Sequence, residues 1–406
     1  MHTATSFVLT LMVLGYAVVS GVVKRWYVAP ALIFVGLGMM FGPFGFNLLA
    51  AGPGTSGYTV LAQLALTVIL FNQAAKLDPG KVFRRGHVTF RLLVIGIPLT
   101  LVLGTLTAAV LLPVLPWWEA VCLAAIVAPT EIALIDALLE DNRIPDRVRN
   151  ALSVESGFYD GFALAVLLAA LALASAHSDQ RPRTWTWFVM RTEVVSLVIG
   201  AVIGLLGAAL IAWSRRRGWM SDTWAQLATL AVALICFEFG ERVHASGFVA
   251  AFTGGLAFAV VARRSNTQLS NQVSDATAQL LELLVFAMFG AFAVIDSWQH
   301  TSWRVVLFCV VAIFGVRMVA VLVALIRTDL PGYSRVFVGW FGPRGIGTVV
   351  LGLLVIERGD IEHADLLAQA GVIAVTLSLV MHSLTAPLGI SRYGSRARVG
   401  SGPVAD

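Results

Sequence analysis

The sequence predicts an all-α polytopic membrane protein with about thirteen transmembrane helices. Of its 406 residues, 58% are hydrophobic and 13% are charged, about half the charged share of a soluble domain. The mean hydropathy is +0.85. A water-soluble fold of this length has too little interior to cover so much apolar surface, so we expect lipid to surround the chain. The net charge of +5 is spread over short loops, which excludes a basic patch for nucleic acid.

Thirteen apolar segments are long enough to cross a bilayer. Their approximate limits are 4–23, 27–50, 58–75, 90–113, 117–139, 149–174, 188–213, 222–239, 244–262, 279–295, 303–326, 334–356 and 364–388. Because no loop is long enough for a soluble domain, we expect one transmembrane unit over residues 1–390. The remaining residues, 391–406, are expected to form a short, disordered cytoplasmic tail.

The basic residues of the loops predict the orientation of the chain. Most of the 28 Lys and Arg residues fall in one set of alternate loops, and a missed or extra span would destroy this alternation. Cytoplasmic loops carry the excess of positive charge, so we expect the N-terminus outside and the C-terminus in the cytoplasm. The expected location is the inner (cytoplasmic) membrane of a bacterial-type cell.

Ionisable residues inside the spans are the strongest functional signal, because a charge in hydrocarbon is costly. At about 1.5 Å per residue, Asp160 is expected about 16 Å deep, near the midplane. Four further charged residues are expected at a similar level, namely Glu131, Glu155, Arg317 and Arg344. Asp136 and Glu282 are expected nearer to span ends. Charges from four spans at one level indicate a substrate site rather than scattered ion pairs.

Prolines interrupt the fifth and twelfth spans beside these charges. A proline inside a helix removes one backbone hydrogen bond and frees the carbonyl four residues back. In a membrane this is tolerated where the backbone faces protein or a water-filled cavity. Pro129 precedes Thr130 and Glu131, and Pro343 precedes Arg344. Two interrupted spans at corresponding places favour a transporter of inverted repeats, and two ordinary proline kinks are the alternative.

The two expected repeats cover residues 4–174 and 222–388, with residues 188–213 as the linking helix. Four motifs stand out in the sequence: VAPTE at 127–131, RVRNALSVESGFYDG at 147–161, SGFVAAFTGGLAF at 246–258 and VGWFGPRG at 338–345. Together they resemble motifs of the monovalent cation:proton antiporter-1 family, the NhaP-like and sodium/hydrogen-exchanger group. The correspondence covers nearly all the spans in order.

The resemblance implies crossed broken helices 5 and 12, a core that moves against a dimerisation domain, and a homodimer in the membrane. It implies exchange of a monovalent cation, Na⁺, K⁺ or Li⁺, for H⁺, with Asp160 as the shared cation and proton site. Thr130 is similar to a position that contributes to the cation site. Glu155 and Arg317 are similar to a structural ion pair, and Arg344 to an arginine that offsets helix-end and carboxylate charge.

Ser156 lies one helical turn before Asp160 and supplies a possible hydroxyl ligand. The expected cation ligands are therefore Asp160, Glu131, Thr130 and Ser156. We expect no cofactor apart from the transported ions. Cys122, Cys236 and Cys309 stand singly in apolar stretches and are interpreted as buried small hydrophobes.

Two residues depart from the family pattern. Glu131 stands where the A-P-T-D motif has aspartate, and Tyr159 stands where the family has asparagine before the key aspartate. Tyr159 follows Glu155 by one helical turn, so its hydroxyl is expected to reach the Glu155–Arg317 pair or Glu131. We therefore hypothesise that the changes at Tyr159 and Glu131 are coupled. The alternative is that Tyr159 simply packs against lipid or a neighbouring helix.

Three other functions compete with exchange. A cation channel or uniporter needs a stripe of polar residues along several spans, and the sequence shows none. A non-transporting regulatory relative is an alternative because of the two departures. An intramembrane aspartyl protease needs its own paired motifs, which are absent, so no enzymatic activity is expected. His244 and His382 are interpreted as interfacial or helix-capping residues rather than metal ligands.

Overall fold

The structure is a computed structural model that describes residues 2–26, 28–49, 56–77, 87–135, 141, 143–178, 182–264, 272–358 and 361–400. All regular elements in these ranges are helical. Ten of the described helical segments are long and apolar enough to cross a membrane. Three shorter apolar helices, Pro30–Phe41, Trp117–Val127 and Ile346–Ile356, occupy the remaining expected spans. The prediction of an all-α polytopic fold is confirmed.

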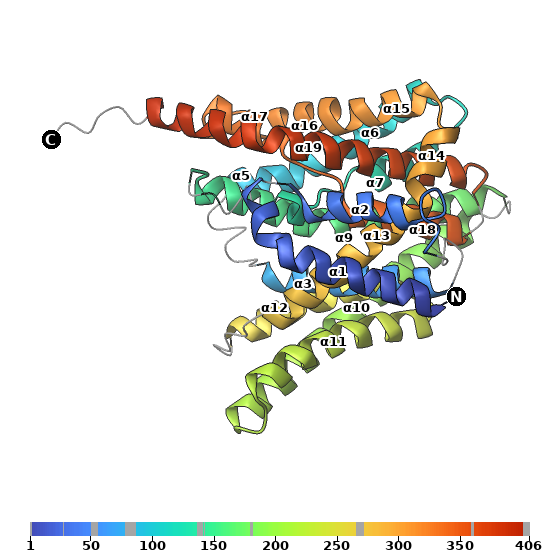
Figure 1. Cartoon of the computed structure of the whole chain (residues 1–406). Helices are drawn as coiled ribbons and strands as arrows, with labels where there is room; N and C mark the ends of the chain where they lie inside the picture. The colour runs from blue at the N-terminus through green and yellow to red at the C-terminus, as the bar shows by residue number, and fades with distance from the viewer. Residues whose placement is uncertain are drawn as a thin grey trace.

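The first half of the chain contains α1 (His2–Arg25), α2 (Pro30–Phe41), α3 (Ser56–Lys76), α5 (His87–Arg91), η1 (Leu92–Gly96), α6 (Ile97–Leu111), α7 (Trp117–Val127), η2 (Ile132–Ile135), α9 (Asp146–Ser178) and α10 (Pro182–Arg216). The second half contains α11 (Asp222–Arg242), α12 (Gly247–Arg264), α13 (Gln272–Phe289), η3 (Gly290–Val294), α14 (Ile295–His300), α15 (Trp303–Val310), η4 (Val311–Val316), α16 (Arg317–Ala324), α17 (Gly332–Trp340), α18 (Ile346–Arg358) and α19 (Ala364–Gly400). The path of the chain is drawn in Figure 1.

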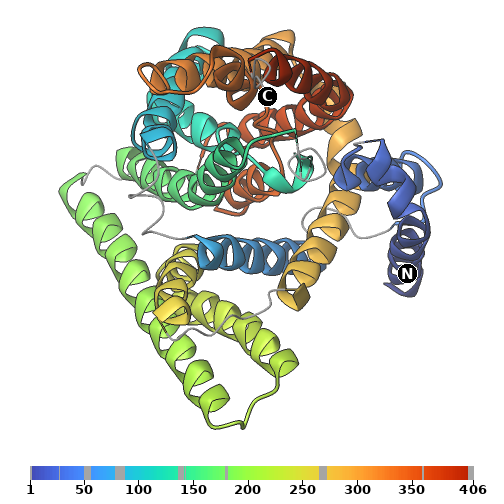
Figure 2. The same cartoon turned by 90° about the vertical axis from the view of Figure 1, so that its left-hand side faces the viewer.

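The helices form two groups (Figure 2). We call α5 to α9 with α15 to α19 the site bundle, because it holds both interrupted spans. We call α1 to α3 with α10 to α14 the flanking bundle, in which α12 packs against both α10 and α3. Helix α3 also contacts α9 and α18, so it lies where the two bundles meet.

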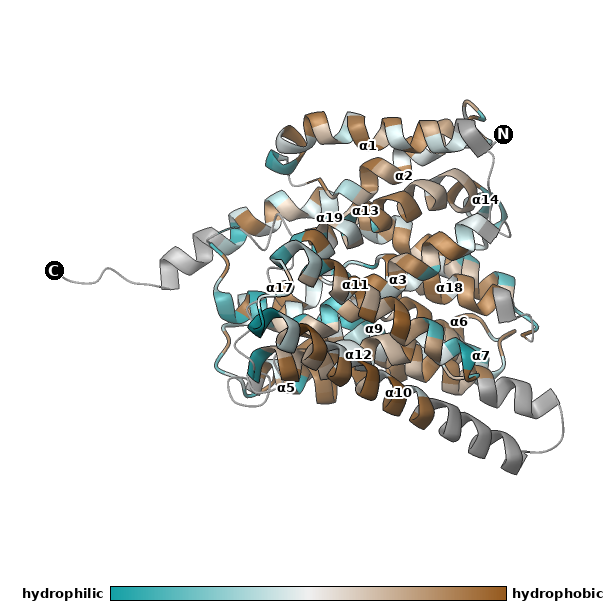
Figure 3. Cartoon of the chain, turned by 90° about the horizontal axis from the view of Figure 1, so that it is seen from below, coloured by the Kyte–Doolittle hydropathy of each residue, from teal (hydrophilic) through white to brown (hydrophobic). Residues whose placement is uncertain are grey.

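The outer surface of the helices is apolar, as a lipid-facing surface must be. Val18 on α1, Val110 on α6 and Leu206 on α10 are 80%, 77% and 65% exposed. Hydrophobic residues cover much of the helix length in Figure 3, and hydrophilic residues gather towards the helix ends. Because helices satisfy their own backbone hydrogen bonds, such surfaces are stable against hydrocarbon. The protein is therefore a multi-span membrane protein.

The expected disordered tail after residue 390 is wrong for residues 391–400. Helix α19 continues to Gly400 without a break at Pro387. Tyr393 is buried and lies 2.9 Å, by its hydroxyl, from the hydroxyl of Ser334 on α17. Its ring also packs edge-on against Phe337. These contacts extend the helix beyond the point where composition alone predicts an end.

Several residues used in the sequence predictions lie outside the described residues. They are Asp136 of the fifth span and the basic loop residues Lys81, Arg84, Arg85 and Arg181.

Candidate ion-binding site

The two interrupted spans cross at their breaks. Helix α7 ends at Val127, and α17 ends at Trp340. The backbone N–H of Glu131 donates to the carbonyl of Pro343 over 2.7 Å. The prediction that both prolines mark non-helical backbone inside the membrane is confirmed, and each break satisfies backbone groups of the other.

Arg344 joins the crossing from the second break. Its Nη1 donates to the carbonyl oxygens of Ala128, at 2.7 Å, and Pro129, at 3.1 Å. These carbonyls stand at the C-terminal end of α7, where a helix carries partial negative charge. Arg344 is fully buried and has no ion-pair partner among the described residues. The guanidinium of Arg344 therefore lies at the C-terminal end of α7, and its role in offsetting helix-end and carboxylate charge stays a prediction.

Helix α19 holds the unwound segment 341–345 at both ends. Nε2 of His382 lies 2.9 Å from the carbonyl oxygen of Trp340, the last residue of α17. One turn earlier, Ser378 Oγ accepts from the backbone N–H of Arg344 over 2.7 Å. His382 thus has a helix-capping role, as predicted, although it lies in the middle of α19 rather than near a span end.

We expect His382→Leu to lower stability by about 1–3 kcal/mol, because the buried Trp340 carbonyl loses its donor. The measurement is thermal or denaturant unfolding of the purified protein in detergent. His300→Leu is the matched control, since His300 is solvent-exposed and should change stability by less than about 0.5 kcal/mol. Equal stability of the two variants would contradict the capping role.

The expected pair of Glu155 and Arg317 is present. Arg317 Nη1 lies 2.9 Å from Glu155 Oε1, and Nη2 lies 3.2 Å from Oε2. The side chain of Glu155 is 3% exposed and that of Arg317 is 1% exposed, so this is a buried bidentate ion pair. Nη2 also donates to the carbonyl of Val338 over 3.3 Å, which ties the pair to α17. A π-helical turn, η4, immediately precedes Arg317.

Asp160 lies on α9 beside the start of α18. It is 4% exposed, and its Oδ2 has no hydrogen-bond partner among the described residues. A Cβ added at Gly347 would stand 2.6 Å from Asp160 Oδ1, so the glycine permits this close approach. The Glu131 carboxylate is within electrostatic reach of Asp160. The structure thus brings together the two carboxylates that the sequence placed on different spans.

The two predicted hydroxyl residues lie at the same crossing. Ser156 Oγ donates to the backbone carbonyl of Thr130 over 2.5 Å and joins α9 to the break after α7. Both residues are buried. Hydroxyl, carbonyl and carboxylate oxygens are the ligands that hard cations prefer, so the cation-ligand role of these two residues, and of Asp160 and Glu131, stays a prediction. The described residues contain no cluster of three or more His, Cys, Asp or Glu suited to a metal cofactor.

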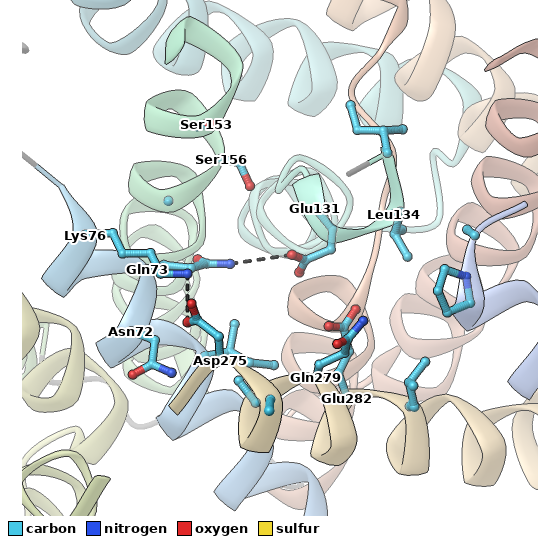
Figure 4. A pocket seen from close by; sticks show the side chains of 18 of the residues that line it. Asn72, Gln73, Lys76, Glu131, Leu134, Ser153, Ser156, Asp275, Gln279 and Glu282 are labelled. Carbon is cyan, nitrogen blue, oxygen red and sulfur yellow. Dashed lines mark hydrogen bonds and ion pairs between the residues drawn. The ribbon is translucent and has the colours of Figure 1, made fainter. Parts of the chain in front are cut away.

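A cavity of about 1480 Å³ leads to this crossing. Glu131 and Ser156 line its inner part, and Lys24, Lys76 and Arg147 line it towards the end of the molecule that carries the basic loops. Figure 4 shows Glu131 facing side chains of the flanking bundle across the cavity. Glu131 and Ser156 of the candidate site are therefore accessible from the basic end of the protein.

Glu282 is placed differently from the prediction. Helix α13 begins at Gln272, so Glu282 lies about 15 Å along it rather than at its start. The side chain is buried and lines the cavity, as Figure 4 shows. The helix begins seven residues before the apolar window, so Glu282 is not at the helix start, and its interfacial position stays a prediction.

Gln73 on α3 is a site residue that the sequence reasoning missed. Its Nε2 lies 3.5 Å from Glu131 Oε1, and the amide also interacts with the Asp160 carboxyl group. The high cost of burying a charge singles out ionisable residues in a span, and an uncharged amide carries no such signal. The polar pair Asn72–Gln73, inside the apolar third span, was the signal available in the sequence.

Tyr159 is fully buried within the main hydrophobic core. Its hydroxyl makes no hydrogen bond to Glu155, Arg317 or Glu131, so the expected bond is wrong. The packing of the Tyr159 ring in the core, rather than its helical spacing from Glu155, determines where the hydroxyl lies. Packing against lipid is also excluded, and coupling with Glu131 stays a prediction for a double-mutant cycle.

We expect Tyr159→Phe to keep the exchange rate within about twofold and to change stability by no more than about 1 kcal/mol, because the hydroxyl bonds to no charged residue of the site. Exchange in proteoliposomes and unfolding in detergent are the two measurements. A large loss of exchange with stability unchanged would show that the hydroxyl acts in transport.

Comparison with known proteins agrees with this geometry. The family model described as the transmembrane sodium/hydrogen exchanger matches residues 8–389. The chain belongs to the sodium/hydrogen exchanger family. The match includes both interrupted spans and the linking helix.

Curated relatives carry antiporter names. The chain is 26% identical over 381 residues to a probable Na⁺/H⁺ antiporter of Schizosaccharomyces pombe, covering 86% of this chain and 49% of the relative. It is 25% identical over 380 residues to a K⁺/H⁺ antiporter of Alkalimonas amylolytica, covering 92% of this chain and 64% of the relative. The chain thus spans about half to two thirds of the length of these relatives.

A solved structure shares the fold. The sodium proton antiporter of Methanocaldococcus jannaschii at pH 8 matches this family member with a TM-score of 0.73 and 18% identity. The match covers 96% of this chain and 99% of the solved chain. The arrangement of all the spans is therefore that of a known antiporter fold.

Proposed function

We propose that this exchanger-family protein exchanges a monovalent cation for H⁺ by alternating access, with Asp160 as the shared site. The observation that carries the proposal is the position of Asp160. It is a buried carboxylate on α9, one helical turn after Ser156, which bonds to Thr130 at the crossing of the two broken helices. It interacts with Glu131, which lines the cavity. A cation and a proton both bind carboxylate oxygen, so one excludes the other.

Alternating access follows from the two bundles. Asp160 and Glu131 belong to the site bundle, and the opposite wall of the cavity belongs to α3 and α13 of the flanking bundle. Movement of one bundle against the other closes the cavity at the basic end and opens the site to the opposite end. This is transport without chemical change of the substrate, so we propose no enzymatic activity and no cofactor.

We propose Na⁺, K⁺ and Li⁺ as the candidate cations. All three bind oxygen ligands, and the names of the relatives include both Na⁺ and K⁺. The proposed location is the inner membrane, with the N-terminus outside and the basic end in the cytoplasm. The proposed assembly is a homodimer, and the internal plan is two inverted repeats related through the crossed breaks at Pro129 and Pro343.

The test is cation-driven proton movement in proteoliposomes that contain a pH-sensitive dye. Addition of Na⁺, K⁺ or Li⁺ in turn, at constant ionic strength, should change the internal pH for at least one cation. An ionophore that collapses the pH gradient should abolish the signal. Cation uptake with no proton movement would instead support the channel or uniporter alternative.

A further inference from the structure

Gln73 links the two bundles at the candidate site. Helix α3 belongs to the flanking bundle, whereas both carboxylates belong to the site bundle. A Cβ added at Gly157 on α9 would stand 3.7 Å from the Cβ of Gln73, so the two helices pass directly alongside each other. The Gln73 amide therefore lies between the two bundles, which move relative to each other in the proposed mechanism.

The two ends of the amide have different surroundings. Nε2 lies 3.5 Å from Glu131 Oε1, as the dashed line in Figure 4 marks, and Asp160 is within reach. The distance is long for a strong hydrogen bond, which suits a group shared between two carboxylates. Oε1 of Gln73 is buried and has no hydrogen-bond partner among the described residues.

We propose that Gln73 is a gating residue that joins the two bundles while the site carries neither a cation nor a proton. This inference rests on the proposed exchange function and adds a residue that couples the two ion movements. The proposed role determines which ion-loading states can change the side from which the site is accessible, and it does not determine which ion binds.

The physical reason is the charge dependence of the amide contact. A hydrogen bond from an N–H group to an ionised carboxylate is stronger than one to a neutral carboxyl. Protonation therefore weakens the contact, and a bound cation occupies the same carboxylate oxygens. When a cation is present, rotation of the amide turns Oε1 towards it as an additional oxygen ligand. The contact is strongest when neither a cation nor a proton is bound, so in that state the two bundles do not move against each other.

An antiporter depends on this restraint. If the unloaded carrier changes its accessible side, it returns without a proton, and cation movement becomes uncoupled. Gln73→Met keeps the length of the side chain but removes both the donor and the acceptor. We expect it to raise uncoupled cation uptake by about tenfold, the effect of losing roughly one charge-assisted hydrogen bond.

The experiment records two fluxes in the same proteoliposomes, held at an inside-negative potential without a pH gradient. One is uptake of a radioactive tracer for whichever of Na⁺ and K⁺ drives the larger proton movement in the wild type. The other is proton movement, reported by an internal pH dye. Gln279→Met is the matched control, because Gln279 lines the same cavity and its side chain makes no hydrogen bond among the described residues.

The expected result is a higher ratio of tracer to protons for Gln73→Met and a wild-type ratio for Gln279→Met. A wild-type ratio in Gln73→Met, or loss of both fluxes in folded protein, would overturn the proposal. If Gln73→Met does not fold, Gln73→Asn decides by the same ratio, since its shorter amide cannot bridge both carboxylates. Failure of the exchange function itself is visible separately, as a wild type without cation-linked proton movement.

Discussion

Replacing Asp160 with Asn is expected to reduce exchange to the level of protein-free vesicles while the protein stays folded. Asparagine has nearly the same shape as aspartate, but it carries no negative charge and takes up no proton in this pH range. Both transported ions therefore lose their site together. The measurement is dye-reported exchange in proteoliposomes, with size-exclusion profiles and thermal unfolding as the checks of folding.

Glu119→Gln is the matched control for this variant. Glu119 is also a buried carboxylate, but it lies in the first turn of α7, where its Oε2 contacts His363 Nδ1 at 2.7 Å. An amide oxygen at this position still accepts a hydrogen bond from His363. Exchange should persist in Glu119→Gln, and exchange above background in Asp160→Asn would show that ions bind elsewhere.

Glu155→Ala and Arg317→Ala are each expected to destabilise the protein by about 3–5 kcal/mol. Each substitution leaves the other charge buried without its partner, and the observed pair is bidentate and almost completely enclosed. The double variant should recover part of the loss, because it leaves no unpaired charge. Unfolding in detergent gives the three values, and strictly additive losses would contradict a direct interaction.

A partly exposed ion pair provides the comparison for this cycle. Asp141 and Arg143 contact each other at 2.7 Å, with side chains 14% and 43% exposed. Arg143→Ala should cost no more than about 1 kcal/mol, because water and salt screen such a pair. A loss of stability as large as that of Arg317→Ala would show that burial of the ion pair does not determine the size of the loss.

The fold was largely predictable because hydropathy is summed over a whole span and basic residues are counted over whole loops, so single residues change neither signal much. The interruptions at Pro129 and Pro343 were also predictable, since proline cannot continue the hydrogen bonding of a helix. The helical residues 391–400 were not, because the contact of Tyr393 with Ser334 joins residues far apart in the sequence. Composition reports the local preference of a segment and carries no information about such a partner.

Site residues were predictable where burial of charge is costly. Asp160, Glu155 and Arg317 stand out in an apolar sequence for that reason. Gln73 carries no charge and was missed, although its position at the bundle boundary makes it a neighbour of both carboxylates. The hydroxyl of Tyr159 was assigned partners from helical spacing, whereas packing of its ring in the core directs it elsewhere.

The most direct test of a shared site is the pH dependence of the apparent KM for the transported cation. If the cation and the proton compete for Asp160, lowering the pH should raise KM while the maximal rate at saturating cation changes little. At low pH the increase should approach about tenfold per pH unit, as expected for one competing proton. A KM that is independent of pH, with only the maximal rate falling, would contradict the shared site.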